Sequence, residues 1–188
     1  MKIPRLFNAF FTPLALLTAL ALAVPRPAIA DSKAEIDRDV DSALQKLYDS
    51  TPAAKVLAKN AKGILMFPGI IKGGFIIGGQ YGTGALREYG RTAGYYRTVS
   101  VSYGLQAGGQ SFGYALFFMN DSALNYLKKS KGWEIGVGPS IVIVDAGVAR
   151  SLTTTTAKDD IYAFFFDQKG LMAGLGLQGT KITRIKPR

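Results

Sequence analysis

The side chains that most often perform catalysis or bind metal ions are missing from this sequence. Its 188 residues include no histidine and no cysteine, so the commonest general base, the commonest metal ligand and the thiolate are all absent. Ser100, Ser102 and Ser111 lie in alternating strand patterns, without the strand-to-helix elbow that presents a serine nucleophile. Asp159 and Asp160 are adjacent, so on a strand they would point to opposite faces. We therefore expect a non-catalytic protein with no metal site and no cofactor.

A glycine pattern near the C-terminus matches a dinucleotide-binding fingerprint by letter only. Gly174, Gly176 and Gly179 have the spacing G-x-G-x-x-G, but that fingerprint must open a helix within a βαβ unit. Residues 180–185 instead read TKITRI, which continues a strand pattern. No nucleotide cofactor is expected.

The first thirty residues have the features of a secretory signal peptide. Lys2 and Arg5 precede an apolar run over residues 14–24, and Ala28-Ile29-Ala30 is a small-x-small cleavage site. The run is shorter than the roughly 20 residues that span a bilayer. We expect cleavage near Ala30, export to the periplasm or cell envelope, and a single mature domain at residues 31–188.

The remaining candidates for a functional role are the basic side chains. The formal net charge is +10, with 23 lysines and arginines against 13 acidic residues, and removing Lys2, Arg5 and Arg26 lowers it to +7. Outside the cytoplasm nucleic acid is scarce, whereas anionic headgroups are abundant, so a basic domain there favours membrane surfaces. We expect an anionic phospholipid or membrane surface as partner, an envelope protein as the alternative, and no nucleic acid. The candidate lipid-binding residues are Lys55, Lys59, Lys62, Lys72, Arg87, Arg91 and Arg97.

Three helices are expected to carry part of this charge. Residues 32–50 place apolar side chains at helical spacing, and Thr51-Pro52 begins a second helix that runs to about Lys62. That second helix predicts Lys55, Lys59 and Lys62 on one face. A third helix lies near residues 121–131, between the capping Asn120 and Gly132.

Glycine dominates the segment that follows the second helix. Residues 63–113 hold 14 of the 22 glycines among β-branched and aromatic residues. From Val99 to Ala107 one strand face is large and apolar and the other is small, and residues 133–143 repeat that alternation. Regular strand glycines indicate either strong curvature or the close approach of another backbone or flat ligand, and we favour curvature.

The remaining strands are expected at residues 161–167 and 171–185, joined by a turn at 167–170, with a loop at residues 153–156. The predicted fold class is α+β: N-terminal helices packed on a strongly curved, glycine-rich, mainly antiparallel sheet, with one further helix near 121–131.

Four segments follow one another along the chain: GILMFPGIIKGGFIIGGQYGTGALR (63–87), GYYRTVSVSYGLQAGGQS (94–111), GWEIGVGPS (132–140) and GLMAGLGLQGTKITRI (170–185). In this order they resemble the SYLF domain, a lipid-binding module found alone in secreted bacterial proteins and joined to other domains in eukaryotic endocytic adaptors. The resemblance implies association with membrane lipid, with phosphoinositides in the eukaryotic relatives. The actin binding of some relatives is not transferred to specific residues here. The family often carries acidic residues around positions 80 and 83, where this chain has Gln80 and Thr83.

Two other functions fit part of the sequence. The first is a scaffold that binds an envelope protein through its glycine-lined face. A small outer-membrane β-barrel is the other, since a signal peptide, alternating strands and nine tyrosines are typical of such proteins. The predicted helices, the unbroken apolar runs YAFFF and IVIV, and the basic ending Lys186-Pro187-Arg188 oppose the barrel.

Overall fold

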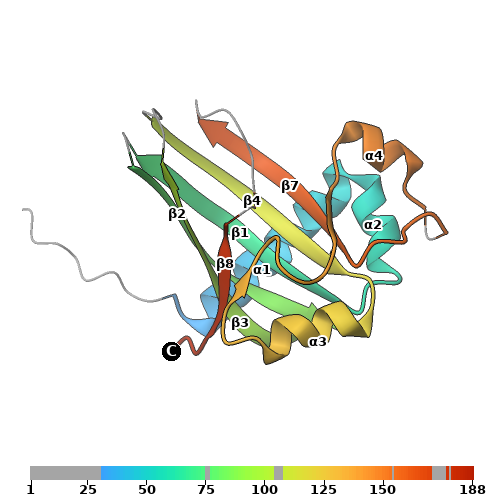
Figure 1. The fold of residues 1–188 in the computed structure, drawn as a ribbon, viewed down its shortest axis with the longest axis horizontal. Helices are drawn as coiled ribbons and strands as arrows, with labels where there is room; N and C mark the ends of the chain where they lie inside the picture. The colour runs from blue at the N-terminus through green and yellow to red at the C-terminus, as the bar shows by residue number, and fades with distance from the viewer. Residues whose placement is uncertain (1–30, 75–76, 104–107, 154, 171–176, 178) are drawn as a thin grey trace, which may run out of the picture.

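An eight-stranded sheet with helices on both faces forms the structure, a computed structural model that describes residues 31–188 apart from 75–76, 104–107, 154, 171–176 and 178 (Figure 1). The strand order is β5-β8-β3-β2-β1-β4-β7-β6. The strand pairs are antiparallel, except that β6 and β7 are parallel. This confirms the α+β fold class with a mainly antiparallel sheet. The helices are α1 (Lys33–Ser50), α2 (Pro52–Ala58), α3 (Asp121–Lys129) and α4 (Ala146–Ser151). The strands are β1 (Gly63–Gly74), β2 (Ile77–Glu88), β3 (Arg91–Tyr103), β4 (Gly108–Phe118), β5 (Trp133–Glu134), β6 (Ile141–Ile143), β7 (Ile161–Gly170) and β8 (Lys181–Ile185).

The first helix begins at a reciprocal cap that the sequence encodes locally. The Glu35 backbone N–H donates to the Ser32 hydroxyl, and the Ser32 backbone N–H donates to the Glu35 carboxylate. These hydrogen bonds hold the pKa of Glu35 below its usual value, with the Ser32 backbone as the largest cause. The predicted helix over residues 32–50 is therefore confirmed.

Two apolar clusters lie on opposite faces of the sheet. On the outer face, α1 and α2 bury their apolar sides against side chains such as Met66 and Phe117. On the inner face, α3 and Trp133 cover a second cluster that includes Phe67 and Tyr114. Alternate residues of each central strand thus belong to different clusters, as the period of two requires.

Glycines on the inner face allow the strong curl of the sheet. A Cβ added at Gly84 would lie 2.0 Å from the Met66 carbonyl oxygen, and one at Gly82 would lie 2.3 Å from Ile70 Cδ1. At these positions only a glycine lets β1 fold this closely over β2. The predicted curvature of the glycine-rich sheet is confirmed.

Three local predictions were wrong. Residues 133–143 do not form one strand, because the chain turns at Gly136 and Gly138, whose φ angles are 104° and 92°. The predicted turn at 167–170 is the end of β7, where Asp167 has a positive φ of 51°. The second helix ends at Ala58 rather than near Lys62. Helix α4 was not predicted, and the expected strand positions at 105, 107 and 171–176 lie outside the described residues.

Helix α1 runs obliquely behind the sheet in Figure 1 and divides its outer face into two parts. On one side of α1 lie α2 and the ends of the β2–β3 hairpin. On the other side, β1, β2 and β4 extend past the helix toward the upper left of the view. Across the described part of the chain, no helix combines the length and the apolar character needed to cross a membrane.

Candidate functional site

A pocket of about 670 Å³ lies between the α1–α2 pair and the hairpin of β2 and β3. Two exposed lysines, Lys59 and Lys62, and the guanidinium-bearing Arg87 line it together with two tyrosines, Tyr48 and Tyr89. Lys59 is the C-cap of α2, and Lys62 follows the helix immediately before β1. The remaining lining residues are Asp41, Leu44, Ala58, Asn60, Ala61, Gly63, Ile64 and Gly90.

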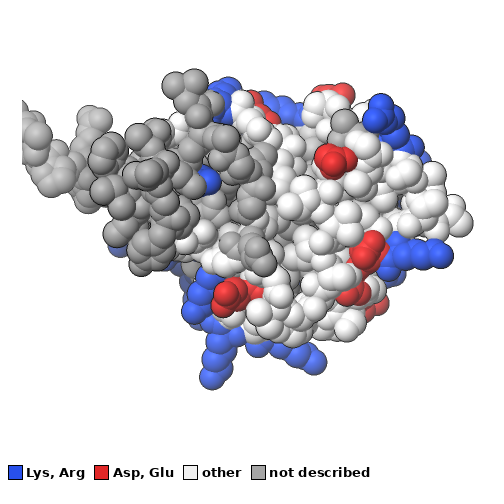
Figure 2. Space-filling view, turned by 45° about the horizontal axis from the view of Figure 1, so that its top comes forward, with Lys and Arg blue, Asp and Glu red and all other residues white. Residues whose placement is uncertain are grey.

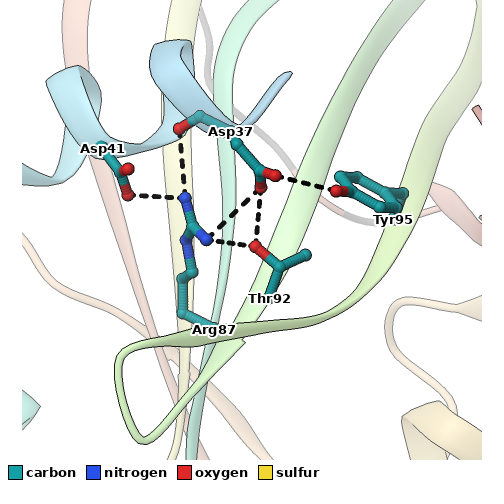
Figure 3. A network of polar contacts seen from close by, with 5 residues as sticks. All are labelled: Asp37, Asp41, Arg87, Thr92 and Tyr95. Carbon is teal, nitrogen blue, oxygen red and sulfur yellow. Dashed lines mark hydrogen bonds and ion pairs between the residues drawn. The ribbon is translucent and has the colours of Figure 1, made fainter. Parts of the chain in front are cut away.

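One wall of the pocket is held by a polar network between α1 and the hairpin (Figure 3). Arg87 lies 2.6 Å from Asp41 and 3.3 Å from Asp37, and it donates a further 3.1 Å hydrogen bond to the Asp37 carbonyl oxygen. Asp37 also accepts hydrogen bonds from Thr92 at 2.6 Å and from Tyr95 at 2.8 Å. The Arg87 side chain is only 12% exposed, so its charge is largely used to join α1 to the sheet.

The tyrosines of this region differ in their surroundings. Burial, and then the hydrogen bond to Asp37, raises the pKa of Tyr95. Burial also raises the pKa of Tyr48, which lines the pocket. Tyrosine is neutral at physiological pH even with its ordinary pKa, and the exposed cations of the pocket rim are Lys59 and Lys62.

Tyr89 occupies an unusual position at the tip of the hairpin. Tyr89 and Gly90 have φ angles of 50° and 75°, the backbone of a two-residue type I′ turn, for which asparagine and glycine are the preferred residues. A large aromatic residue is uncommon at positive φ, and this ring is 90% exposed. Strain at an exposed residue without a packing role suggests function. Tyr89 was not among the residues predicted from the sequence, although the dipeptide Tyr-Gly between two strands was a visible signal.

The structure brings together some of the predicted lipid-binding residues and separates others. Lys59, Lys62 and Arg87 line the pocket, Lys55 is exposed on α2, and Arg91 is exposed where β3 begins, next to the tip of the hairpin. Lys72 and Arg97 lie outside this pocket. Lys72 is half-buried on β1, and the Arg97 guanidinium lies 5.6 Å from the centre of the Tyr81 ring. Figure 2 likewise shows basic side chains distributed around the margin of one face rather than in a single patch.

Three other sequence features have structural explanations. The adjacent pair Tyr95–Tyr96 serves the fold, since Tyr96 is 2% exposed and the Tyr95 hydroxyl donates a hydrogen bond to Asp37. At the two positions where the SYLF family often has acidic residues, the buried Gln80 amide donates to Thr180 at 3.0 Å, and Thr83 donates to the Asp31 carboxylate at 2.6 Å. Within the described residues, no three acidic side chains converge as a metal site would require.

This α+β domain with an open, lysine-lined pocket has the form of a ligand-binding domain. Its sequence matches the family Ysc84, described as Las17-binding protein actin regulator, over residues 99–186. The match supports the resemblance to the SYLF family, and residues 99–186 are similar to that family of binding domains. The matched residues run from the middle of β3 to β8, and every residue that lines the lysine-lined pocket precedes them. No curated protein matches the chain.

Proposed function

We propose that this protein is a non-catalytic lipid-binding domain of the cell envelope that associates with anionic membrane headgroups. The pocket between α1, α2 and the β2–β3 hairpin is the proposed contact. The observation that carries the proposal is the placement of two exposed lysines around one concavity beside a fully projecting tyrosine. The family match supports a binding role, and the signal-peptide pattern supports export to the periplasm or envelope.

The chemistry of the pocket suits the boundary between lipid headgroups and water. Each lysine near a charged membrane surface contributes about 1 kcal/mol of electrostatic attraction. The Tyr89 ring is amphipathic, so it can lie among headgroups while its hydroxyl stays hydrated. Because Asp37 and Asp41 already pair with Arg87, their carboxylates repel an anionic headgroup less than free carboxylates would.

Vesicle co-sedimentation of the chain from Asp31 onward tests the proposal. We expect binding to anionic vesicles that weakens as salt rises, because mobile ions screen exposed charges, and little binding to zwitterionic vesicles. Reversing both charges with Lys59→Glu and Lys62→Glu should weaken binding at least about tenfold.

A matched control changes the net charge equally at exposed lysines away from the pocket, with Lys158→Glu and Lys186→Glu. Equal losses in the two double variants would show that only net charge matters and would contradict a localised site. A folded wild-type protein that binds neither kind of vesicle would overturn the membrane function and favour a protein partner.

A further inference from the structure

A second surface of the molecule is apolar and exposed, and it lies on the outer face of the sheet on the side of α1 away from the lysine-lined pocket. Its apolar members come from three adjacent strands, β1, β2 and β3. Ile71 is 71% exposed, Val101 60%, Tyr81 47% and Val99 40%. We call this surface the shelf.

The shelf has two parallel rows of residues, fixed by strand register. Ile71 pairs with Tyr81, and Tyr81 pairs with Val99, so these three bulky side chains form a ridge across β1, β2 and β3. Two residues away from the ridge, toward the β1–β2 hairpin, Gly73 pairs with Gly79 and with Gly109 of β4, which forms a glycine row beside the ridge. The row ends at the exposed Val101, the partner of Gly79 on β3. The two rows share one face because side chains alternate along a strand.

Two glycines of this row, Gly79 and Gly109, are not required by the described fold. A Cβ at Gly79 would meet nothing nearer than the Ser100 carbonyl oxygen at 3.8 Å, and a Cβ at Gly109 nothing nearer than the Lys72 carbonyl oxygen at 4.0 Å. Neither has a positive φ. Gly84 differs, since its Cβ would collide with β1. Glycine within a strand costs roughly 0.5–1 kcal/mol relative to alanine, so an exposed row of it points to something that approaches from outside.

The arrangement favours a rigid partner over a bilayer. Lipid is fluid and adapts to side chains, so it does not need a glycine row. Helix α1, about 10 Å thick, also stands on the same face beside the shelf and would hold a flat membrane away from it. A protein surface with a ridge of its own can enter a glycine row closely.

We propose that the shelf binds the same shelf of a second copy of this chain. On β1 and β2 the ridge and the glycine row are offset by two residues, and this makes the surface complementary to itself on these two strands. A two-fold axis parallel to the rows places Tyr81 of one copy over Gly79 of the other, Ile71 over Gly73, and, at the β3 end, Val99 over Val101 in an apolar contact. Such an isologous contact requires only one patch per molecule. Lys169 and Lys181 are exposed on β7 and β8 at the two ends of the ridge. This axis places each of them at the solvated rim beside the same lysine of the other copy, and that like-charge contact also limits the strength of the dimer.

The size of the shelf sets the expected strength. Four strands about 4.8 Å apart and about six residues long cover on the order of 400 Å² per copy. The total of about 800 Å² is smaller than a standard stable interface of roughly 1,600 Å². The dimer should therefore be weak and reversible.

Sedimentation velocity tests this inference on protein purified in the form that cells produce. Protein concentrations of about 10 μM to 1 mM are suited to a weak interface. We expect a dimer that grows with concentration. Gly79→Val and Ile71→Ser should each raise the dimer dissociation constant at least about tenfold. Because valine favours strands, Gly79→Val should leave the thermal midpoint unchanged or higher, an outcome that a glycine needed for folding would not give.

Val137→Ser is the matched control, since Val137 is 56% exposed in the turn after β5 and lies outside the shelf. It should leave the dimer unchanged. A protein that stays monomeric over the whole range would overturn the inference, as would a dimer that Gly79→Val does not weaken. Loss of vesicle binding in Ile71→Ser, without any dimer in the wild type, would assign the shelf to membrane instead. If Lys59→Glu and Lys62→Glu did not change vesicle binding, the proposed headgroup site would be wrong, but the sedimentation result for the dimer would still stand.

Discussion

At the scale of single residues, Tyr89 is the clearest example of a side chain that the stability of the fold does not require. Its neighbours Glu88 and Arg91 continue two paired strands, and the turn between them needs positive φ at both central positions. Asparagine would fit this backbone better than tyrosine, and no packing contact explains a ring that is 90% exposed. The tyrosine is therefore best explained by what it touches outside the molecule.

Tyr89→Asn tests this explanation. The free energy of unfolding should stay the same or rise by up to about 1 kcal/mol, because asparagine tolerates positive φ more readily. Affinity for anionic vesicles should fall by about threefold to tenfold, since an interfacial aromatic ring is lost. Urea denaturation and vesicle co-sedimentation measure the two effects. Tyr89→Phe keeps the ring and should bind as the wild type does, and a Tyr89→Asn protein with unchanged vesicle affinity would contradict a membrane role for the hairpin tip.

At the scale of secondary-structure elements, Asp160 joins three segments that are distant in sequence. Its carboxylate accepts hydrogen bonds from the Asn120 amide at 2.7 Å and from the Ser140 backbone N–H at 2.9 Å. Asn120 also caps α3 by accepting from the Ala123 N–H at 2.8 Å. The carboxylate thus positions the start of α3 and the chain before β6. The Ser140 backbone hydrogen bond, followed by the one from Asn120, lowers the pKa of Asp160.

The lowered pKa gives Asp160→Asn a pH signature. A carboxylate whose folded pKa lies below its unfolded value stabilises the fold above the unfolded pKa, about 3.9, and loses this effect as pH falls. We expect the substitution to cost about 1 kcal/mol near pH 7, because charge-assisted hydrogen bonds are lost at a solvent-accessible site. The cost should shrink below about pH 4. Urea denaturation at several pH values measures it, with the exposed Asp39→Asn as control. An equal cost at pH 3 and pH 7 would argue against the charged carboxylate as its source.

The elements themselves were predictable wherever a local rule was sufficient. Ser32 with Glu35, and Asn120 before α3, gave correct helix starts because capping depends on residues within one turn. The prediction of one strand over residues 133–143 was wrong because apolar residues separated by glycines also occur in turns. Ile135 is 5% exposed while Val137, two positions later, is 56% exposed, so the alternation that looked like a strand is not one.

The candidate pocket depended on contacts that no local pattern encodes. Lys59 and Lys62 were identified from charge and spacing, and they do line one pocket. The role of Arg87 was not foreseen, since its partners Asp37 and Asp41 lie 50 and 46 residues earlier in the chain. A charged side chain on a strand can either point into solvent or form an ion pair. For Arg87, the packing of α1 on the sheet determines that it forms ion pairs.

At the scale of the whole molecule, the curl of the sheet brings its two apolar clusters and the pocket into their relative positions, and glycines on the inner face make it possible. Gly84 is the most restrictive of them, because a Cβ there would lie 2.0 Å from the Met66 carbonyl oxygen and 2.8 Å from the Phe67 ring. Neither neighbour can move easily. The carbonyl belongs to the adjoining strand, and Phe67 is fully buried.

Gly84→Ala should therefore destabilise the protein by about 3 kcal/mol or more, because the added methyl group forces β1 and β2 apart and opens both clusters. Gly69→Ala is the matched control, since Gly69 lies on the paired strand β1, likewise has no positive φ, and its Cβ would meet nothing within 4 Å. It should change the unfolding free energy by less than about 1 kcal/mol. Urea denaturation followed by circular dichroism compares the two. Equal stability of both variants would mean that the curl does not depend on close approach at Gly84, and the curvature of the sheet would then need another cause, such as the bulge between Phe67 and Ile70.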